Sequence, residues 1–255
     1  MNRRTCDYNS VANSYDARYS VNPLYGIGDA LTSLIARRKP ATVLEVGCGT
    51  GHWLAELRAH LSLIVGADAS IEMLRRNQSG APVAVARANT LPFRSGICDL
   101  VYCVNALHHF DDPQRFVSQA AELMKPRGTL AIIGIDPRLI HTRYFYEYFD
   151  PALDIDMQRY PSIGTIVDWM VVAGFDDIGY RTVETWKSRF TGRQVFDDTF
   201  LRKETNSTLA VLTAEEYQAG IHKIEAAIVR AEAEGYEVTF DTVLPFGMLH
   251  GILAS

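Results

Sequence analysis

The residues of this 255-residue chain most suited to chemistry form a glycine-rich turn, Gly47-Cys48-Gly49-Thr50-Gly51. An apolar stretch, Val43–Val46, precedes the turn and predicts a buried strand, and a helix is predicted from His52 onward. A strand that leads into such a turn and then into a helix brings the backbone close to a ligand and points helix N-terminal amides at it. A tight structural turn without a ligand is the alternative.

The spacing of the glycines limits the kind of ligand. The dinucleotide fingerprint GxGxxG needs a third glycine at position 52, where this chain has His52. Asp68 follows about 20 residues after Gly47, at the end of the next predicted strand, where an acid can accept hydrogen bonds from a ribose diol. A surface role for Asp68 is the alternative. The two features favour a nucleoside ligand without a pyrophosphate.

Alternating helix-like and strand-like segments surround this turn, and they predict a parallel sheet with helices on both faces. A capping box at Thr213–Glu216 opens a long helix that ends at Gly235. The last predicted strand contains Pro245 and several glycines, which favours the edge of the sheet. The other predicted helices are 24–39, 52–60, 70–76, 113–124 and 162–173, and the predicted strands are 43–46, 61–67, 82–86, 99–104, 129–135, 178–185 and 238–253.

Composition excludes several classes of protein. The net charge is −5, and the 25 basic residues form no stripe, so nucleic acid is not expected as a partner. The four cysteines include no CxxC pair, which argues against a disulfide scaffold or a zinc knuckle. The N-terminal residues lack an apolar signal region and the apolar runs are short, so we expect a cytoplasmic protein with no membrane partner.

The segment Val43–Gly51 resembles the first motif of the class I S-adenosylmethionine-dependent methyltransferases, specifically the small-molecule, methyltransferase type 11-like group. Further stretches resemble this family in the same order, over roughly residues 40 to 180: Gly66–Leu74, Leu91–Phe93, Cys98–Val101, Asn105–Phe110, Leu123–Leu130 and Val172–Phe175. An ordered set of motifs is far more specific than any one of them.

The resemblance implies S-adenosylmethionine as the cofactor and S-adenosylhomocysteine as its product. It implies that Asp68 holds both ribose hydroxyls, that Ala69 lies against the adenine, and that Asn105 lines the pocket beside the sulfonium. The residues implied to face the methionine part are Glu45, Gly47, Cys48, Gly49 and Gly51.

One position departs from the family pattern. Where the family often has an aspartate that accepts from the adenine amino group, this chain reads Arg87-Ala88-Asn89, and arginine has no acceptor. The backbone amide of Ala88 is implied to contact the adenine. Either Asn89 supplies the acceptor, or the adenine is bound by backbone alone.

Three histidines are candidates for a general base. His108 and His109 follow the fourth predicted strand, at the mouth of the cofactor site, and His141 lies beyond the fifth. Packing without a catalytic role is the alternative for the pair. No carboxylate or cysteine lies at ligand spacing from His52, His108 and His109, so no metal is expected. The stretch from Asn105 also lacks the Asn-Pro-Pro-Tyr type signature of nucleobase methyltransferases, which disfavours DNA modification.

The N-terminal run Tyr8, Tyr15, Asp16, Arg18 and Tyr19 resembles the lid helix that precedes many of these domains. Tyr15 and Arg18 are therefore candidate cofactor contacts, and an aromatic helix that packs on the core is the alternative.

Two segments predict a cover over the substrate. Residues 138–161 are dense in aromatic and acidic side chains, and ligands of open α/β sheets lie outside the carboxyl ends of the strands. Residues 187–236 form a second excursion. Tyr144, Tyr146 and Tyr148 are the candidate substrate contacts. An oligomer interface built from the same aromatics is the alternative, so we expect a monomer or a homodimer.

The sequence thus predicts an α/β fold: a Rossmann-like, doubly wound, mostly parallel seven-stranded sheet with an antiparallel last strand, plus a substrate cap. Its single domain comprises a lid (1–23), the cofactor-binding core (24–136, 162–186 and 237–255) and two cap insertions (137–161 and 187–236). The predicted function is methyl transfer from S-adenosylmethionine to an O, N or C atom of a small molecule. A non-catalytic cofactor-binding or scaffold protein, and another group transfer on the same fold, are the alternatives.

Overall fold

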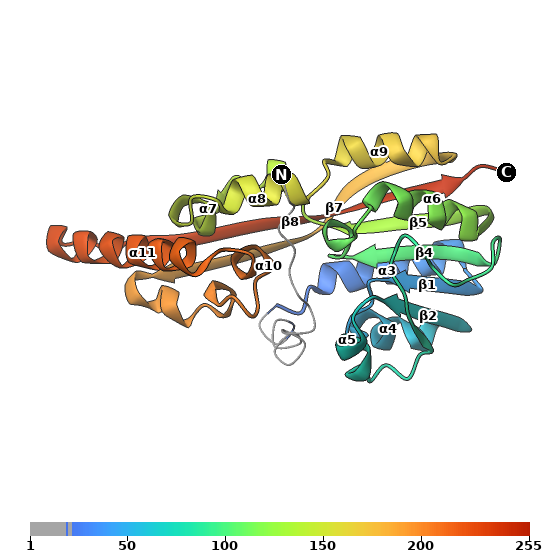
Figure 1. Ribbon diagram of the computed structural model, residues 1–255, viewed down its shortest axis with the longest axis horizontal. Helices are drawn as coiled ribbons and strands as arrows, with labels where there is room; N and C mark the ends of the chain where they lie inside the picture. The colour runs from blue at the N-terminus through green and yellow to red at the C-terminus, as the bar shows by residue number, and fades with distance from the viewer. Residues whose placement is uncertain (1–18, 20–21) are drawn as a thin grey trace.

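An eight-stranded mixed sheet carries the fold in the computed structural model, which describes Tyr19 and residues 22–255 (Figure 1). The strands are β1 (Thr42–Val46), β2 (Leu63–Asp68), β3 (Val83–Val85), β4 (Cys98–Val104), β5 (Met124–Gly134), β6 (Thr142–Arg143), β7 (Phe175–Thr191) and β8 (Thr239–Leu253). Their order is β3-β2-β1-β4-β5-β8-β6, and β7 pairs with β8. Pairing is parallel from β3 to β5, whereas β8 runs antiparallel to its neighbours. The predicted fold class is confirmed, with β6 as a short additional strand.

Helices cover both faces of the parallel strands, because successive strand residues point to opposite faces. Val43, Leu100 and Tyr102 pack with α3 (Tyr25–Arg38) and α4 (His52–Leu57) on one face. Leu44 and Val101 pack with α6 (Pro113–Leu123) and α9 (Ile163–Val172) on the other face. The helices are α3 (Tyr25–Arg38), α4 (His52–Leu57), α5 (Ile71–Arg75), α6 (Pro113–Leu123), α7 (Tyr144–Tyr148), α8 (Ala152–Arg159), α9 (Ile163–Val172), α10 (Ser207–Ala210) and α11 (Ala214–Glu234), with short 3₁₀ turns η1 (Arg58–His60), η2 (Leu107–His109), η3 (Pro137–Leu139), η4 (Gly192–Asp197) and η5 (Thr199–Leu201).

Local sequence signals set several helix ends. The Ser70 hydroxyl accepts a hydrogen bond from the Met73 amide at 3.2 Å and caps α5. Thr213 and Glu216 form the predicted capping box of α11. Gly235 ends that helix with a φ of +79°, a conformation that glycine adopts without steric cost.

The last strand is not at the edge of the sheet, so this prediction is wrong. β8 lies between β5 on one side and β7 on the other. On the side of β8 that faces β5 and β6, Pro245 lies between the part that pairs with β6, at Thr242 and Val243, and the part that pairs with β5, from Gly247 onward. The missing proline N–H therefore breaks no bond of these two ladders, whereas on the other side Pro245 lies opposite Thr185 of β7.

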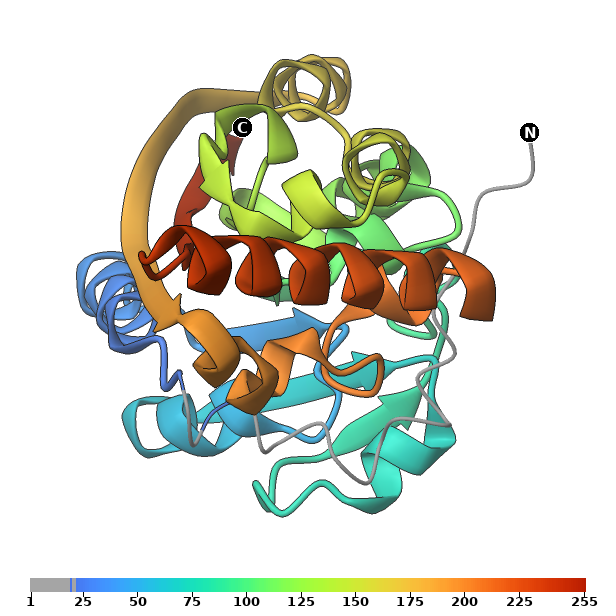
Figure 2. The same cartoon turned by 90° about the vertical axis from the view of Figure 1, so that its left-hand side faces the viewer.

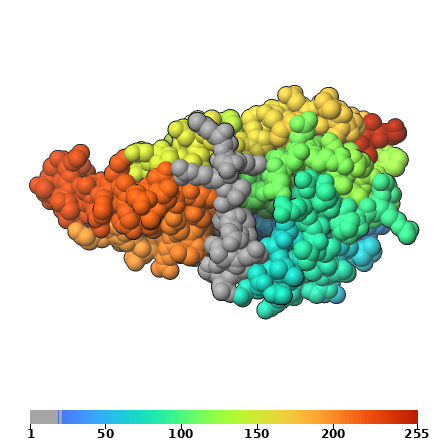
Figure 3. All heavy atoms as spheres, viewed as in Figure 1, coloured from blue at the N-terminus to red at the C-terminus, as the bar shows by residue number. Residues whose placement is uncertain are grey.

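β7 and β8 are much longer than the other strands and pair from Phe175–Leu253 to Thr191–Thr239. Since β5 pairs only with residues 247–252 of β8, the other half of this antiparallel ribbon extends beyond the parallel sheet. Figure 1 shows the ribbon leading from the core into a second layer of helices, and Figure 3 shows that these residues form a projection from the body.

The projecting part has an apolar core of its own, and we call it the cap: residues 137–161 together with residues 187–243. Phe145, Phe149 and Ile155 from the first segment pack with Leu209, Ile224 and Ile228 from the second. Figure 2 views the molecule from the outer end of the cap, and in this view α11 runs across the cap. Gly220 permits the close approach of α11 to α7, since a Cβ there would lie 2.2 Å from the Phe149 ring. The two excursions therefore share one core.

Candidate functional site

The glycine-rich turn connects β1 to α4 at the carboxyl end of the sheet. Its glycines have positive φ angles, +76° at Gly47, +52° at Gly49 and +85° at Gly51, which disfavour other residues. A Cβ on Gly47 would lie 2.5 Å from the Ala106 Cβ, and one on Gly51 would meet the Asn77 amide at 2.6 Å. At Gly49, by contrast, no heavy atom of the described chain lies within 4 Å of that position. The turn is therefore close-packed at both ends and open at its centre.

Asp68 ties the end of β2 to this turn. Its Oδ2 accepts a hydrogen bond from the Gly49 amide at 2.8 Å, and its Oδ1 accepts one from the Ser70 amide at 2.8 Å. Burial raises the pKa of the carboxyl above its ordinary value, and the backbone hydrogen bonds partly oppose this shift. A carboxylate has about four acceptor positions, so acceptor capacity remains for a diol.

The side chains of Glu45 and Cys48 turn into the protein. Glu45 is only 1% exposed, and its Oε2 accepts a hydrogen bond from the Tyr102 hydroxyl of β4 at 3.0 Å. Burial raises the pKa of Glu45 well above its ordinary range. The Cys48 Sγ faces β2, where a Cβ on Gly66 would lie 2.7 Å away. Within the turn, Cys48 therefore offers a ligand its backbone and not its thiol.

The residues predicted to lie along the adenine follow two neighbouring strands. Ala69, directly after β2, is exposed, and Ala88, in the loop after β3, is buried. The Asn89 Oδ1 is buried and has no hydrogen-bond partner among the described residues. Arg87 forms an ion pair with Asp111 instead. An orphaned acceptor beside Ala88 fits an amino group such as that of adenine.

Asn105 ends β4 next to the turn. Its φ of +50° is unusual for a residue other than glycine, and its amide donates to the Ile133 carbonyl of β5 at 2.8 Å. The following residue, Ala106, contacts Gly47 as described above. Asn105 also lines two adjoining pockets, one beneath the cap and one between β5 and α9.

His108 and His109 follow in η2. The His108 ring is 8% exposed, stacks on Tyr160 with ring centroids 3.8 Å apart, and lies 3.7 Å from the His109 ring. The His109 Nδ1 lies 3.4 Å from Nη2 of Arg159. Both histidines line the pocket beneath the cap together with Asn105. Two of the predicted general bases are thus at the same pocket.

The pocket beneath the cap has a volume of about 110 Å³. The core contributes Asn105 and the two histidines, and the cap contributes Arg143, Phe145 and the segment from Thr205 to Thr208. Tyr19, which stacks on His52 with ring centroids 3.7 Å apart, lies at its edge. Tyr15 and Arg18, the predicted lid contacts, lie outside the described residues.

Four other candidates are not at this pocket. His141 is exposed and lines a different hollow on the cap. Tyr144 is 3% exposed and donates to Asp198 at 2.7 Å, inside the cap core. The Tyr146 hydroxyl donates to Asp156 at 2.9 Å, and Tyr148 packs on Phe240. These three tyrosines contact other cap residues and lie away from the pocket beneath the cap, and a substrate role for them stays a prediction.

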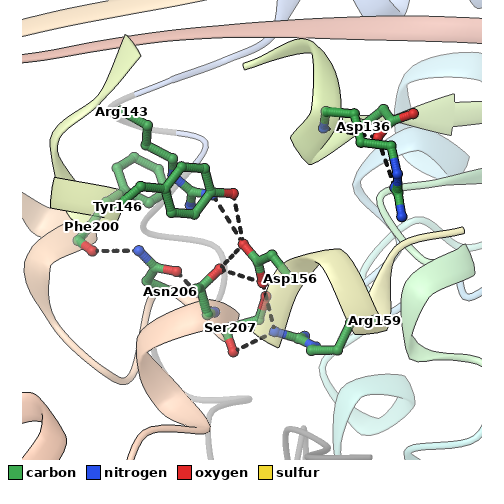
Figure 4. Close-up of polar contacts among 10 residues, drawn as sticks. Asp136, Arg143, Tyr146, Asp156, Arg159, Phe200, Asn206 and Ser207 are labelled. Carbon is green, nitrogen blue, oxygen red and sulfur yellow. Dashed lines mark hydrogen bonds and ion pairs between the residues drawn. The ribbon is translucent and has the colours of Figure 1, made fainter. Parts of the chain in front are cut away.

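A buried polar cluster lies beside the pocket, and the sequence did not predict it (Figure 4). Asp156 has no exposed surface and lies 3.3 Å from Nη1 of Arg143 and 3.4 Å from Nη1 of Arg159. The Thr208 hydroxyl donates to Asp156 at 2.8 Å. Figure 4 shows Arg143 of β6 and Arg159 of α8 converging on Asp156, beside Ser207 of α10. Only the i,i+3 spacing of Asp156 and Arg159 was visible in the sequence, and such spacing is common on helix surfaces.

The fold and the site together define a class of protein. A ligand site at the carboxyl ends of β1 and β4, where the strand order reverses, is typical of Rossmann-like nucleoside-binding proteins. Here the turn lacks the dinucleotide fingerprint, and Asp68 lies at the end of β2, where an acidic residue of such proteins contacts a ribose. In the part of the chain that the structure describes, no helix is long and apolar enough to cross a membrane.

Comparison with known proteins identifies the family. Residues 21–179 match a family described as a methyltransferase domain, and the chain belongs to the class I S-adenosylmethionine-dependent methyltransferases.

Two curated relatives illustrate the similarity. The chain is 24% identical over 160 residues to the uncharacterized methyltransferase YcgJ of Bacillus subtilis (56% of this chain, 59% of YcgJ). It is 27% identical over 194 residues to the ubiquinone biosynthesis O-methyltransferase of Xylella fastidiosa (69% and 79%). With several curated relatives the match spans only 51 to 59% of their length.

A solved structure has the same fold over almost the whole chain. The S-adenosylmethionine-dependent methyltransferase of Thermotoga maritima described as a possible histamine N-methyltransferase superimposes with a TM-score of 0.59, at 16% identity, over 96% of this chain and 97% of its own.

Proposed function

We propose that this protein transfers the methyl group of S-adenosylmethionine to an O, N or C atom of a small molecule held beneath the cap. One observation carries the proposal: Asn105 adjoins the glycine-rich turn through Ala106 and also lines the pocket beneath the cap. A cofactor on the turn and an acceptor in the pocket would therefore meet at the end of β4.

The residues around the turn fit the cofactor. The open space above Gly49 leaves room for it, and Asp68 offers acceptor capacity to ribose hydroxyls. The unpartnered Oδ1 of Asn89 offers an acceptor to the adenine amino group. Glu45 and Cys48 would support the turn from below. When bound, S-adenosylmethionine supplies a methyl group that its sulfonium already activates, so the protein needs no nucleophile.

The work left to the protein is to orient the acceptor, exclude water and receive a proton. His108 is the proton acceptor that we propose, because it lines both pockets at Asn105 and its ring is held by stacking on Tyr160. His109 is the second candidate, next to it. The two cap segments would exclude water from the acceptor.

A substrate cap is favoured over an oligomer interface as the role of the two insertions. Interfaces are enriched in exposed aromatic side chains, whereas Tyr144 and Phe145 of α7 and Phe149, which follows this helix, are each 3% exposed or less. The oligomeric state, a monomer or a homodimer, stays a prediction, and so does the cytoplasmic location.

Calorimetric titration tests cofactor binding. Wild type and Asp150→Asn, an exposed cap carboxylate paired with Lys223, should bind S-adenosylmethionine equally, and Asp68→Ala should bind it at least about tenfold more weakly because charge-assisted hydrogen bonds to the ribose are lost. Unchanged binding by Asp68→Ala would count against the proposed site.

Turnover requires a second experiment. The enzyme is incubated with methyl-labelled cofactor and cell-extract metabolites, and mass spectrometry identifies S-adenosylhomocysteine and the labelled product. Both should form with wild type, and both should form much more slowly with Asp68→Ala when the cofactor is limiting. Tight cofactor binding without either product would instead indicate a non-catalytic binding protein.

A further inference from the structure

The pocket beneath the cap is positively charged. Arg143 is the one lining residue with a permanent charge among the described residues of its wall, and none of these is an aspartate or a glutamate. Its guanidinium is 7% exposed, and a buried cation is costly unless an anion compensates it.

The contacts of Arg143 leave part of its donor capacity unused. Nη1 donates to the Tyr146 hydroxyl at 2.9 Å and to Asp156 at 3.3 Å. Nε is buried without a hydrogen-bond partner among the described residues. Its guanidinium carbon also lies 5.2 Å from the centroid of Phe145. An arginine fork with one occupied edge and one orphaned donor is suited to a planar anion.

Asp156 does not neutralise this cation alone, because it is shared with a second arginine. Arg159, 2% exposed, donates to Asp156 at 3.4 Å and to the Ser207 carbonyl at 3.0 Å. Two guanidinium groups thus face one carboxylate. All the contacts of Asp156 are donors: the two arginines, Tyr146 and Thr208.

Asp198 is a second buried carboxylate near the cluster, and it compensates the positive charge of Arg143 and Arg159 only weakly. Asp198 is 3% exposed, and its oxygens accept from the Tyr144 hydroxyl at 2.7 Å and the Phe200 amide at 2.8 Å. It makes no ion pair with an arginine within the described chain. Burial raises the pKa of Asp198, while its hydrogen bonds from Tyr144 and Phe200 and the charge of Arg143 oppose this shift. Because Asp156, the carboxylate paired with Arg143, is shared with Arg159, the wall formed by Arg143 keeps a net positive charge.

The rest of the pocket is suited to a flat organic body. Phe145, Tyr160, Trp186 and Phe200 contribute aromatic surface to the wall. Aromatic walls with a few polar groups orient small unsaturated ligands. The volume, about 110 Å³, limits the ligand to a small molecule.

We propose that the methyl acceptor is a small, unsaturated or aromatic organic acid whose carboxylate binds Arg143, with its body against the aromatic wall and its reacting atom toward His108. This inference rests on the function proposed above for the same pocket. Arg159 acts indirectly, since it holds Asp156 in place.

The test measures binding of matched probes to the full chain in the presence of S-adenosylhomocysteine, with titration calorimetry as the readout. The probes are benzoate, phenylacetate and cinnamate, their three amides, and phenyl phosphate. At least one acid should bind wild type about tenfold or more tightly than its amide, because a charge-assisted bond is lost in the amide. In Arg143→Gln this ratio should fall to about one, and Arg143→Lys should restore part of it.

Arg189→Gln is the matched control, because Arg189 is exposed on the cap ribbon and paired with Asp241. It should keep the wild-type ratio. Three outcomes would overturn the inference: no acid preferred over its amide in wild type, a preference retained in Arg143→Gln, or phenyl phosphate bound more tightly than every acid. If Arg143→Gln fails to fold, the wild-type ratio decides.

The two proposals fail separately. Binding of S-adenosylhomocysteine alone is measured first and reports on the glycine-rich turn. Normal cofactor binding without an acid preference would reject the carboxylate site only. An acid preference without cofactor binding would reject the proposed methyl transfer.

Discussion

The Asp68 carboxylate accepts a hydrogen bond from the Gly49 amide at 2.8 Å, so the end of β2 and the centre of the glycine-rich turn are joined directly. The residue expected to hold the ribose thus also orients the turn expected to hold the rest of the cofactor. Substitutions at either residue should affect cofactor binding, and their effects should differ in pH dependence and in stability.

Cofactor affinity should fall at mildly acidic pH. The ionised form of Asp68 is the acceptor for the ribose hydroxyls, and burial raises its pKa above the ordinary value, so protonation begins at a higher pH than for an exposed aspartate. Calorimetric titrations between about pH 4 and pH 8 measure this. Asp68→Asn should bind weakly at every pH. An affinity that stays constant down to about pH 4 would contradict the expected role.

Gly49→Ala should weaken cofactor binding by about tenfold or more while costing only about 1 kcal/mol of stability. An added Cβ would enter the open space above the turn and require a strained φ. Gly192→Ala is a closely matched control, because Gly192 has the same φ of +52° and equally open surroundings within the described chain, but lies in the cap. Urea unfolding should give similar losses of stability for both variants.

Only the Gly49 variant should lose cofactor affinity in calorimetry. Equal cofactor binding by both variants would mean that the space above Gly49 does not receive the ligand.

Glu45→Gln should raise the melting temperature at neutral pH more than at pH near 5. Burial raises the pKa of Glu45 in the folded state, so between its unfolded pKa and its raised folded pKa the folded protein binds the extra proton. Stability of the wild type therefore falls as pH rises through this window, by up to about 1.4 kcal/mol per pH unit. The neutral glutamine removes this slope.

Calorimetric melting of both proteins across this pH range measures the difference. Tyr102→Phe, which removes the 3.0 Å hydrogen bond to Glu45, should destabilise by about 1 to 3 kcal/mol. A stability difference between wild type and Glu45→Gln that does not change with pH would show that Glu45 keeps an ordinary pKa.

His108→Ala should lower kcat by about 10² to 10⁴ with an acceptor whose nucleophile must lose a proton, with cofactor affinity unchanged. His141→Ala should leave both quantities unchanged, because His141 is exposed in a different hollow. Steady-state rates with the acceptor found by mass spectrometry check this. A His108→Ala enzyme as active as wild type would restrict His108 to packing on Tyr160.

The fold class and the cofactor side of the site could be predicted from the sequence because both depend on local patterns. The glycines of the turn need positive φ, the strands need short apolar runs, and Asp68 needs only to follow the second strand. The capping box at Thr213 likewise marks the start of α11 wherever that helix packs. Such features are encoded within a few neighbouring residues.

The position of the last strand could not be predicted in the same way. Pro245 suggested an edge, yet β8 is central, because pairing with β5 and β6 leaves a gap at the proline. The order of strands is a non-local property. A proline indicates only that its backbone N–H is not needed in a ladder, and an edge strand is one of several places where this holds.

The sequence alone thus determined the glycine-rich turn from Gly47 to Gly51 and the place of Asp68 after the second strand, and it predicted a nucleoside site there. Tertiary structure decided the acceptor side. The tyrosines of α7 are used in the cap core, and Arg143 and Tyr160 reach the pocket instead, because the two insertions, which residues 162–186 separate in the sequence, pack on each other. Which face of a short helix is buried depends on the partner that it meets, and that partner is remote in sequence.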